Sequence, residues 1–192
     1  MSWTTTGTRR ANGGIRAMRA LIPLACAVLT IIPMRAGSQD WPPEASEVLD
    51  RFVGDWETQT SIRHDGPPIR ESQTRGRGAC RKTLEGRYFE FRSWSIPPGQ
   101  AELQIMTYDA TTRLYRQWVF DSDGYHHEAE GRWDPTTSTL RWEGRRDGTS
   151  FVIEDRWTAP GRLEWTLQRT GADGRRLQTI TGDLTRVEEP SK

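Results

Sequence analysis

Residues 121–148, DSDGYHHEAEGRWDPTTSTLRWEGRRDG, place three turn signals at a constant interval of about a dozen positions: Asp123-Gly124, Pro135-Thr136 and Asp147-Gly148. An Asp-Gly pair suits the positive φ angles of a hairpin turn, and proline presets the first corner of a type I or II turn. Nearly the same interval continues on both sides of this stretch, at Pro98-Gly99, Ala110-Thr111, Pro160-Gly161 and Asp173-Gly174. It leaves room for one strand of roughly 8 to 10 residues and its turn. The pattern therefore predicts consecutive antiparallel hairpins.

Between these turns the chain has the patterns of ten strands, preceded by one short helix near residues 45–53. The predicted strands are 55–64, 69–77, 87–96, 101–108, 113–121, 125–133, 139–145, 149–157, 162–169 and 175–186. Ser46 precedes the apolar helical positions Val48, Leu49 and Phe52, and Gly54 follows as a stop signal. A short amphipathic helix in this place is typical of a lid on one end of a sheet.

Alternation within the strands separates an apolar face from a charged one. We expect five tryptophans to point inward: Trp118, Trp133, Trp142, Trp157 and Trp165. The opposite phase carries charges that we expect to point outward: Glu130, Arg132, Arg141, Glu143, Glu154 and Arg156. Because one short helix cannot cover ten strands, the sheet must cover its own apolar face, and closure into a barrel does so. The sequence predicts an all-β fold: an antiparallel meander barrel of 8–10 strands with one short N-terminal helix.

Three segments resemble motifs of a known family. Residues 49–56, LDRFVGDW, resemble the helix-to-strand opening of lipocalin-like (calycin) barrels. Residues 84–88, LEGRY, and 107–124, TYDATTRLYRQWVFDSDG, resemble the two central motifs of the bacterial domain-of-unknown-function family 1579. The resemblance covers nearly all of residues 45–186. It implies a small, frequently exported calycin barrel, related in fold to lipocalins and fatty-acid-binding proteins, without an established activity.

The same superfamily includes nitrobindin-like barrels, which hold haem through a histidine late in the chain. No histidine follows His127 here, so we expect no haem and no other cofactor. We assign structural roles to two motif residues. Trp56, after the glycine of the opening motif, plugs a barrel end, and Asp109 closes its turn by accepting hydrogen bonds from backbone amides.

Residues 1–38 differ in composition from the rest of the chain. They contain five arginines and no acidic residue, around an apolar stretch over residues 20–33. This stretch is too short to span a membrane as a helix, which needs roughly 20 residues. A basic start, a short apolar core and the small residues 36–38 are typical of a secretory signal peptide. We therefore expect a signal peptide over 1–38, one barrel domain over 39–192, and an exported protein in the periplasm or outside the cell. Met18 is a second candidate for the translation start, in which case the start codon at residue 1 is misplaced and residues 1–17 do not belong to the protein.

Export would change the charge and the cysteine content of the protein. Loss of residues 1–38 leaves 22 basic against 26 acidic residues, a net charge of −4. A nucleic-acid partner is not expected for such a chain. Cys80 alone remains, so no internal disulfide can form. Its basic neighbours Arg77, Arg81 and Lys82 leave two interpretations open, a passive thiol or one with a lowered pKa.

Three polar residues occupy the phase that we assign to the apolar face: Arg116, His127 and Asp155. Burying an unpaired charge is costly, so such groups pair with one another or meet a ligand. We therefore expect all three to converge inside the barrel. They would form an ion pair that fixes the register, bind an acidic or amphiphilic molecule through Arg116, or catalyse a reaction with His127 as general base.

A metal site is not expected. The calcium-loop pattern at Asp121 and Asp123 is incomplete, and the adjacent His126 and His127 point to opposite faces of a strand. Our prediction for function is an exported barrel that binds a small apolar or amphiphilic ligand without catalysis, and without stable membrane insertion after cleavage. Two alternatives stay open: an enzyme that uses His127 and Arg116 at the barrel mouth, and a structural or interaction module with a filled lumen.

Overall fold

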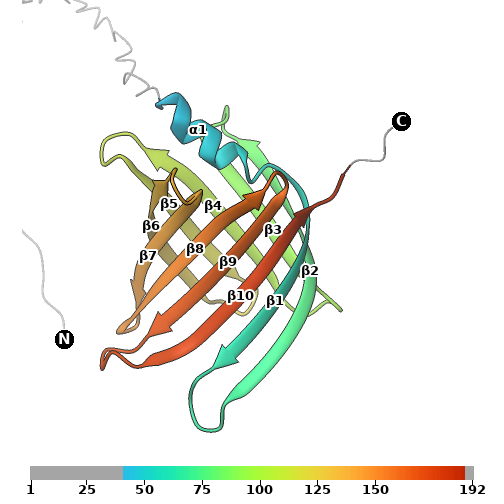
Figure 1. Cartoon of the computed structure of the whole chain (residues 1–192), viewed down its shortest axis with the longest axis vertical. Coiled ribbons are helices and arrows are strands. Elements are labelled where there is room, and N and C mark those ends of the chain that lie inside the picture. Colours follow the sequence, from blue (N-terminus) through green and yellow to red (C-terminus); the bar gives the residue numbers. More distant parts are fainter. Residues whose placement is uncertain (1–40, 189–192) are drawn as a thin grey trace, which may run out of the picture. The chain divides into compact units, whose positions relative to one another are not determined.

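The computed structural model describes residues 41–188, which form ten strands and one helix (Figure 1). The elements are α1 (Pro43–Asp50), β1 (Gly54–His64), β2 (Arg70–Thr83), β3 (Tyr88–Ile96), β4 (Ala101–Asp109), β5 (Leu114–Asp121), β6 (His126–Asp134), β7 (Thr139–Arg146), β8 (Thr149–Ala159), β9 (Arg162–Thr170) and β10 (Arg176–Arg186). Each strand pairs with the next along the chain, and β1 pairs with β10, so the sheet closes into an antiparallel meander barrel. The predicted fold class is confirmed.

The turns form where the spacing predicted them. Gly124, Gly148, Gly161 and Gly174 all have positive φ angles, between 71° and 89°. The Asp109 side chain accepts hydrogen bonds from the backbone amides of Thr111 at 2.9 Å and Thr112 at 3.3 Å. These bonds confirm the turn-closing role assigned to this carboxylate. A hydrogen bond from the Thr112 side chain, together with these backbone bonds, holds the pKa of Asp109 below its ordinary value.

Helix α1 covers one end of the barrel (Figure 1). It begins at Pro43, where a missing N–H costs nothing, and ends at Asp50, so Ser46 lies within the helix and not at its start as predicted. Val48 and Leu49 are buried against the strands. The Trp56 indole is also buried there and donates to the carbonyl oxygen of Phe52 at 2.7 Å, which confirms Trp56 as the plug of this end.

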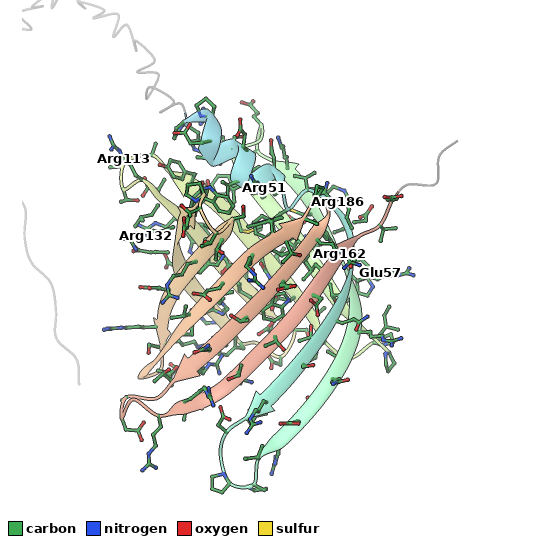
Figure 2. The ribbon with its side chains drawn as sticks, in the orientation of Figure 1. Arg51, Glu57, Arg113, Arg132, Arg162 and Arg186 are labelled. Atoms are coloured by element: carbon green, nitrogen blue, oxygen red, sulfur yellow. The ribbon has the colours of Figure 1, made fainter. Side chains whose placement is uncertain are left out.

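We call the part of the barrel under α1 the closed half; its interior is filled by large side chains. They are Leu49, Phe52, Trp56, Phe89, Met106, Tyr115, Leu140, Trp142 and Trp157, all buried. Arginines cover the outside of this end: the Arg51 guanidinium lies 4.9 Å from the Trp133 ring centre, and Arg186 lies 4.8 Å from that of Trp56 (Figure 2). The side chain of Arg186 also donates to the backbone carbonyl of Arg51 at 2.7 Å, which joins the last strand to the end of the helix.

Inward-facing glycines let aromatic rings lie flat against the barrel wall. Three glycines stand directly opposite the aromatic residue that covers them: Gly131 opposite Trp142, Gly144 opposite Phe151, and Gly182 opposite Trp165. A Cβ at Gly131 would lie 2.6 Å from the Trp142 ring, closer than a real side chain can approach. These positions therefore require glycine so that the rings can pack against the backbone.

The predicted faces hold on most strands. Trp133, Trp142, Trp157 and Trp165 belong to the interior or pack against it. The predicted outward charges lie outside, where Arg141 pairs with Glu143 at 3.1 Å and with Glu154 at 2.5 Å.

The prediction for Trp118 is wrong. On β5 the inward residues are Tyr115, Gln117 and Val119, so Trp118 points outward. Ile105, opposite Trp118 on β4, and Phe120, the next outward residue of β5, are apolar as well. On β6, by contrast, Glu128 stands opposite Trp118. The apolar residues form what we call the outer apolar strip, which runs over β3, β4 and β5: Trp94, Leu103, Ile105, Trp118 and Phe120.

The predicted signal peptide, residues 1–38, lies outside the described residues. Within residues 41–188, no helix is long and apolar enough to cross a membrane.

Candidate functional site

The half of the barrel away from α1, the open half, contains a cavity of about 400 Å³. Small and polar side chains build much of its wall, among them Thr58 and Thr60 of β1 and Ser93 of β3. Its lining extends from Phe52 at the base to the loop residues Gln100 and Ser122. The volume lies within the range of roughly 300 to 1,000 Å³ that small-molecule sites occupy. The cavity is therefore the candidate binding site of this protein.

The prediction that Arg116 points into the barrel is wrong. Arg116 stands opposite Glu130 across β5 and β6, on the outer surface, and its Nη1 donates to that carboxylate at 2.5 Å. Glu128 and Asp109 lie slightly farther from the guanidinium, at 3.9 Å and 3.8 Å. Arg116 is thus held in an outer network of carboxylates, and it neither pairs with Asp155 nor meets a ligand in the lumen.

His127 and Asp155 do line the cavity, on β6 and β8. Both ring nitrogens of His127 are buried without a hydrogen-bond partner among residues 41–188, so no bond joins His127 and Asp155. The imidazole packs edge-on against Phe151, with ring centres 4.6 Å apart. Burial, together with the nearby Arg169 and Arg146 charges, lowers the pKa of His127 to about 4. The imidazole is therefore neutral at physiological pH and lacks the orienting partner that a general base requires.

Asp155 is 92% buried, because only 8% of its surface is exposed. Its Oδ2 accepts a hydrogen bond from Trp142 Nε1 at 2.7 Å, which ties the cavity to the tryptophan at the centre of the closed half. Burial raises the pKa of Asp155 to about 7, and the bond from Trp142 opposes this only in part.

Glu102 and Asp121 form a carboxyl pair that the sequence did not reveal. They stand directly opposite each other on β4 and β5, and both line the cavity. Burial raises the pKa of Glu102 to about 7, and Asp121 and Asp155 add to the effect. The sequence pattern of β4 is misleading because Leu103 and Ile105, of the outer apolar strip, are more apolar than the inward residues. Glu102 therefore seems to belong to the solvent-facing phase.

Two glutamines extend this pair deeper into the wall. Gln104 Nε2 donates to Glu102 Oε1 at 2.5 Å, and Gln117 Nε2 donates to Gln104 Oε1 at 3.0 Å. Gln117 is 3% exposed, and its own Oε1 is buried with no partner. Within the described residues, the chain of amides therefore ends in an acceptor that has no donor.

Two arginines flank Tyr125 at the cavity mouth. The guanidinium carbon of Arg146 lies 4.0 Å from the centre of the tyrosine ring, and that of Arg169 lies 5.0 Å from it. Arg169 Nη2 also donates to the tyrosine hydroxyl at 2.7 Å. The tyrosine therefore keeps these charges at the rim.

Cys80 points into the closed half and is fully buried. Burial raises the pKa of its thiol to about 12. The neighbouring arginines lower it only in part, so the structure supports the passive thiol and not the reactive one.

A closed antiparallel barrel that is capped by one helix and hollow at its other end defines a lipocalin-like barrel protein. The chain matches a protein family of unknown function, DUF1579, over residues 42–186, and it belongs to that family.

Two solved structures share the fold. Rv2717c from M. tuberculosis is 14% identical, with a TM-score of 0.57, over 78% of this chain and 100% of that one. The S-type phycobiliprotein lyase CPES from Guillardia theta is 10% identical, with a TM-score of 0.52, over 75% of this chain and 93% of that one. At these identities the similarity concerns the fold alone. No curated protein matches the sequence.

Proposed function

We propose that this protein binds a small amphiphilic molecule in the open half of its barrel and does not transform it. The observation that carries the proposal is the cavity of about 400 Å³ whose wall combines apolar side chains with buried polar atoms that lack partners. Leu163, Leu167 and Ile153 offer apolar surface, while His127 and Gln117 are lining residues with buried polar atoms that have no partner within the described residues. A ligand that is apolar along most of its length and polar at one end satisfies both.

The two alternatives have less support. The enzyme hypothesis paired His127 with Arg116, but Arg116 lies on the outer surface and His127 has no hydrogen-bond partner in the described part of the chain. The module hypothesis required a filled lumen, and only the closed half is filled.

Two neighbouring residues on β1 provide a test of luminal binding. Thr60 lines the cavity, whereas Ser61 points outward. We expect the uncharged fluorophore N-phenyl-1-naphthylamine to bind saturably, one molecule per chain, to the wild type and to Ser61→Trp. Thr60→Trp should abolish this binding because the indole occupies the cavity. Fluorescence excited where tryptophan does not absorb measures the binding. Equal binding by both variants, or no saturable binding by the wild type, would contradict the proposal.

We further propose that the protein is exported, on the strength of the acid-free, arginine-containing segment before residue 39 and its short apolar core. N-terminal sequencing of the protein from expressing cells checks this. Cleavage near residues 36–38 is the expected result, and an intact Met1 or Met18 on cytoplasmic protein would contradict it.

A further inference from the structure

Three carboxyl groups line the cavity of the open half. Glu102 and Asp121 stand opposite each other on β4 and β5, and Asp155 lines the same cavity from β8. The cavity therefore holds acidic groups that are close enough for Asp155 to act electrostatically on Glu102.

The deep carboxyl groups lack positive counter-charges. Neither Glu102 nor Asp155 forms an ion pair with any residue of the described range 41–188, and no neighbouring cation lowers the pKa of either. Arg169 is bound to the Tyr125 hydroxyl at the rim. Burial raises the pKa of Asp121, and Arg169 and Arg146 oppose this, so these arginines act on Asp121 but do not lower the pKa of Glu102 or Asp155.

The unused acceptor on Gln117 is a second, independent sign of a missing ligand. This residue lines the cavity and is 97% buried, since only 3% of it is exposed, and its Oε1 has no hydrogen-bond donor within the described residues. A buried acceptor without a partner costs roughly 1 to 3 kcal/mol, so such atoms are rare in native proteins unless a ligand or water meets them. The Gln117 oxygen is an acceptor, as are the ionised carboxylates, so this part of the wall favours hydrogen-bond donors. The other unpartnered atoms among the lining residues are Arg169 Nε, which is a donor, and the two His127 ring nitrogens, of which a neutral ring offers one donor and one acceptor.

We propose that the cavity binds organic amines, with the ammonium group at Glu102, Asp121, Asp155 and the Gln117 oxygen and the apolar remainder against Leu167 and Ile153. This inference rests on the proposed function and specifies its ligand class. An ammonium group has three N–H donors and the positive charge that the deep carboxylates lack. A carboxylate or phosphate ligand would meet like charges there, and a neutral alcohol would leave the charges uncompensated.

Proton release accompanies such binding. The pKa values of Glu102 and Asp155 are raised to about 7, so both groups are partly protonated near neutral pH and an arriving ammonium displaces protons. Affinity for an amine should therefore increase from pH 5 to pH 8. The other titratable groups that line the cavity are Arg75, Asp121, Asp123, Tyr125, His127 and Arg169. Asp121 strengthens this trend because its pKa is also raised.

Isothermal titration calorimetry with three ligands of equal chain length tests the inference. Decylamine, 1-decanol and decanoate are titrated at pH 8 and physiological ionic strength into the wild type. We expect decylamine to bind at least about tenfold more tightly than decanol, a difference of about 1.4 kcal/mol, and decanoate to bind most weakly. Repeating the decylamine titration in buffers of different ionisation enthalpy should show proton release at pH 7.

The double variant Glu102→Gln, Asp155→Asn should bind decanol as the wild type does but lose the preference for decylamine. Asn keeps an oxygen for the Trp142 bond, and near-UV circular dichroism checks that the fold is intact. Glu154→Gln, next to Asp155 but outward, is the matched control and should keep the preference. If decanol or decanoate binds as tightly as decylamine, the amine assignment is overturned while luminal binding stands. If none of the three binds, both proposals are overturned.

Discussion

The closed and open halves of this barrel are built by the same ten strands but contain different things. In the closed half the inward positions carry large, buried side chains such as Trp56, Phe89 and Trp142, which pack into one core. In the open half the strands carry threonine, serine and glutamine at many inward positions, for example Thr58 and Ser93, and a cavity of about 400 Å³ results. Alternation decides which residues point inward, whereas the size of those residues decides whether the interior is a core or a site.

The largest effect that we expect separates an inward residue of the closed half from its outward neighbour. Trp142→Ala removes a fully buried indole and should lower the free energy of unfolding by about 3 to 5 kcal/mol. Glu143→Ala, at the next position and on the outer surface, should change it by less than about 0.5 kcal/mol. Urea denaturation measures both. Similar losses at the two positions would mean that the interior of the closed half is not packed as described.

Substitutions that add side-chain volume should also distinguish the two halves, because they should lower the free energy of unfolding more in the closed half than in the open half. Ala129→Leu adds bulk to the packed core and should cost about 1 to 3 kcal/mol of stability. Ser93→Leu adds bulk to the cavity wall and should change stability by less than about 1 kcal/mol, because the space is free. The same denaturation experiment compares the two variants. Equal costs would show that the open half is collapsed in solution.

The pH dependence of stability should report on the carboxyl groups of the open half. Folded Asp155 keeps its proton up to about pH 7, whereas the unfolded chain releases it near the ordinary value of 3.8. The native state therefore binds more protons between pH 4 and 7, so this group lowers stability as the pH rises, by up to about 1.4 kcal/mol per pH unit. Glu102 acts in the same direction. Asp155→Asn should make the profile less steep by up to that amount.

His127 has the opposite effect, because its pKa is lowered to about 4 and the unfolded chain then binds more protons up to about pH 6.5. His127→Gln should therefore make the fall of stability with pH steeper over that range. Thermal unfolding at a series of pH values measures the wild type and both variants. Unchanged profiles in both variants would contradict the burial of these two side chains.

The smallest effect concerns the outer surface. Arg116→Gln should lower stability by less than about 1 kcal/mol, because the ion pairs of this arginine include partly exposed carboxylates. It should leave ligand binding in the lumen unchanged. A loss of binding comparable to that of Thr60→Trp would place Arg116 in the site after all.

Most of the fold can be predicted because its signals are local. Turns at a regular interval and alternation within each strand do not depend on distant contacts, and the barrel follows once ten strands must cover one face. The fifth strand misleads because it is apolar on both sides: Trp118 and Phe120 face out, and Tyr115 and Val119 face in. Only the pairing across β5 and β6 places Arg116 beside Glu130 and settles the face.

The site is predicted less completely. His127 and Asp155 can be found because they interrupt apolar phases on strands whose faces are clear. Glu102 cannot be predicted as a cavity residue from the sequence. On β4 the outward positions are apolar, so the polar phase that contains Glu102 looks like the solvent-facing side. The cavity itself depends on the summed volumes of inward side chains from many strands, which no single strand pattern contains.

The hydrogen bond between Trp142 and Asp155 makes the protein its own optical probe. The carboxyl oxygen lies 2.7 Å from the indole nitrogen, on the part of the ring that loses electron density when it absorbs light. A negative charge that develops on Asp155 stabilises this excited state, so the emission of Trp142 moves to longer wavelength. Trp142 lies in the closed half and is fully buried, so the part of the tryptophan emission that is lost in Trp142→Phe would record the ionisation of Asp155.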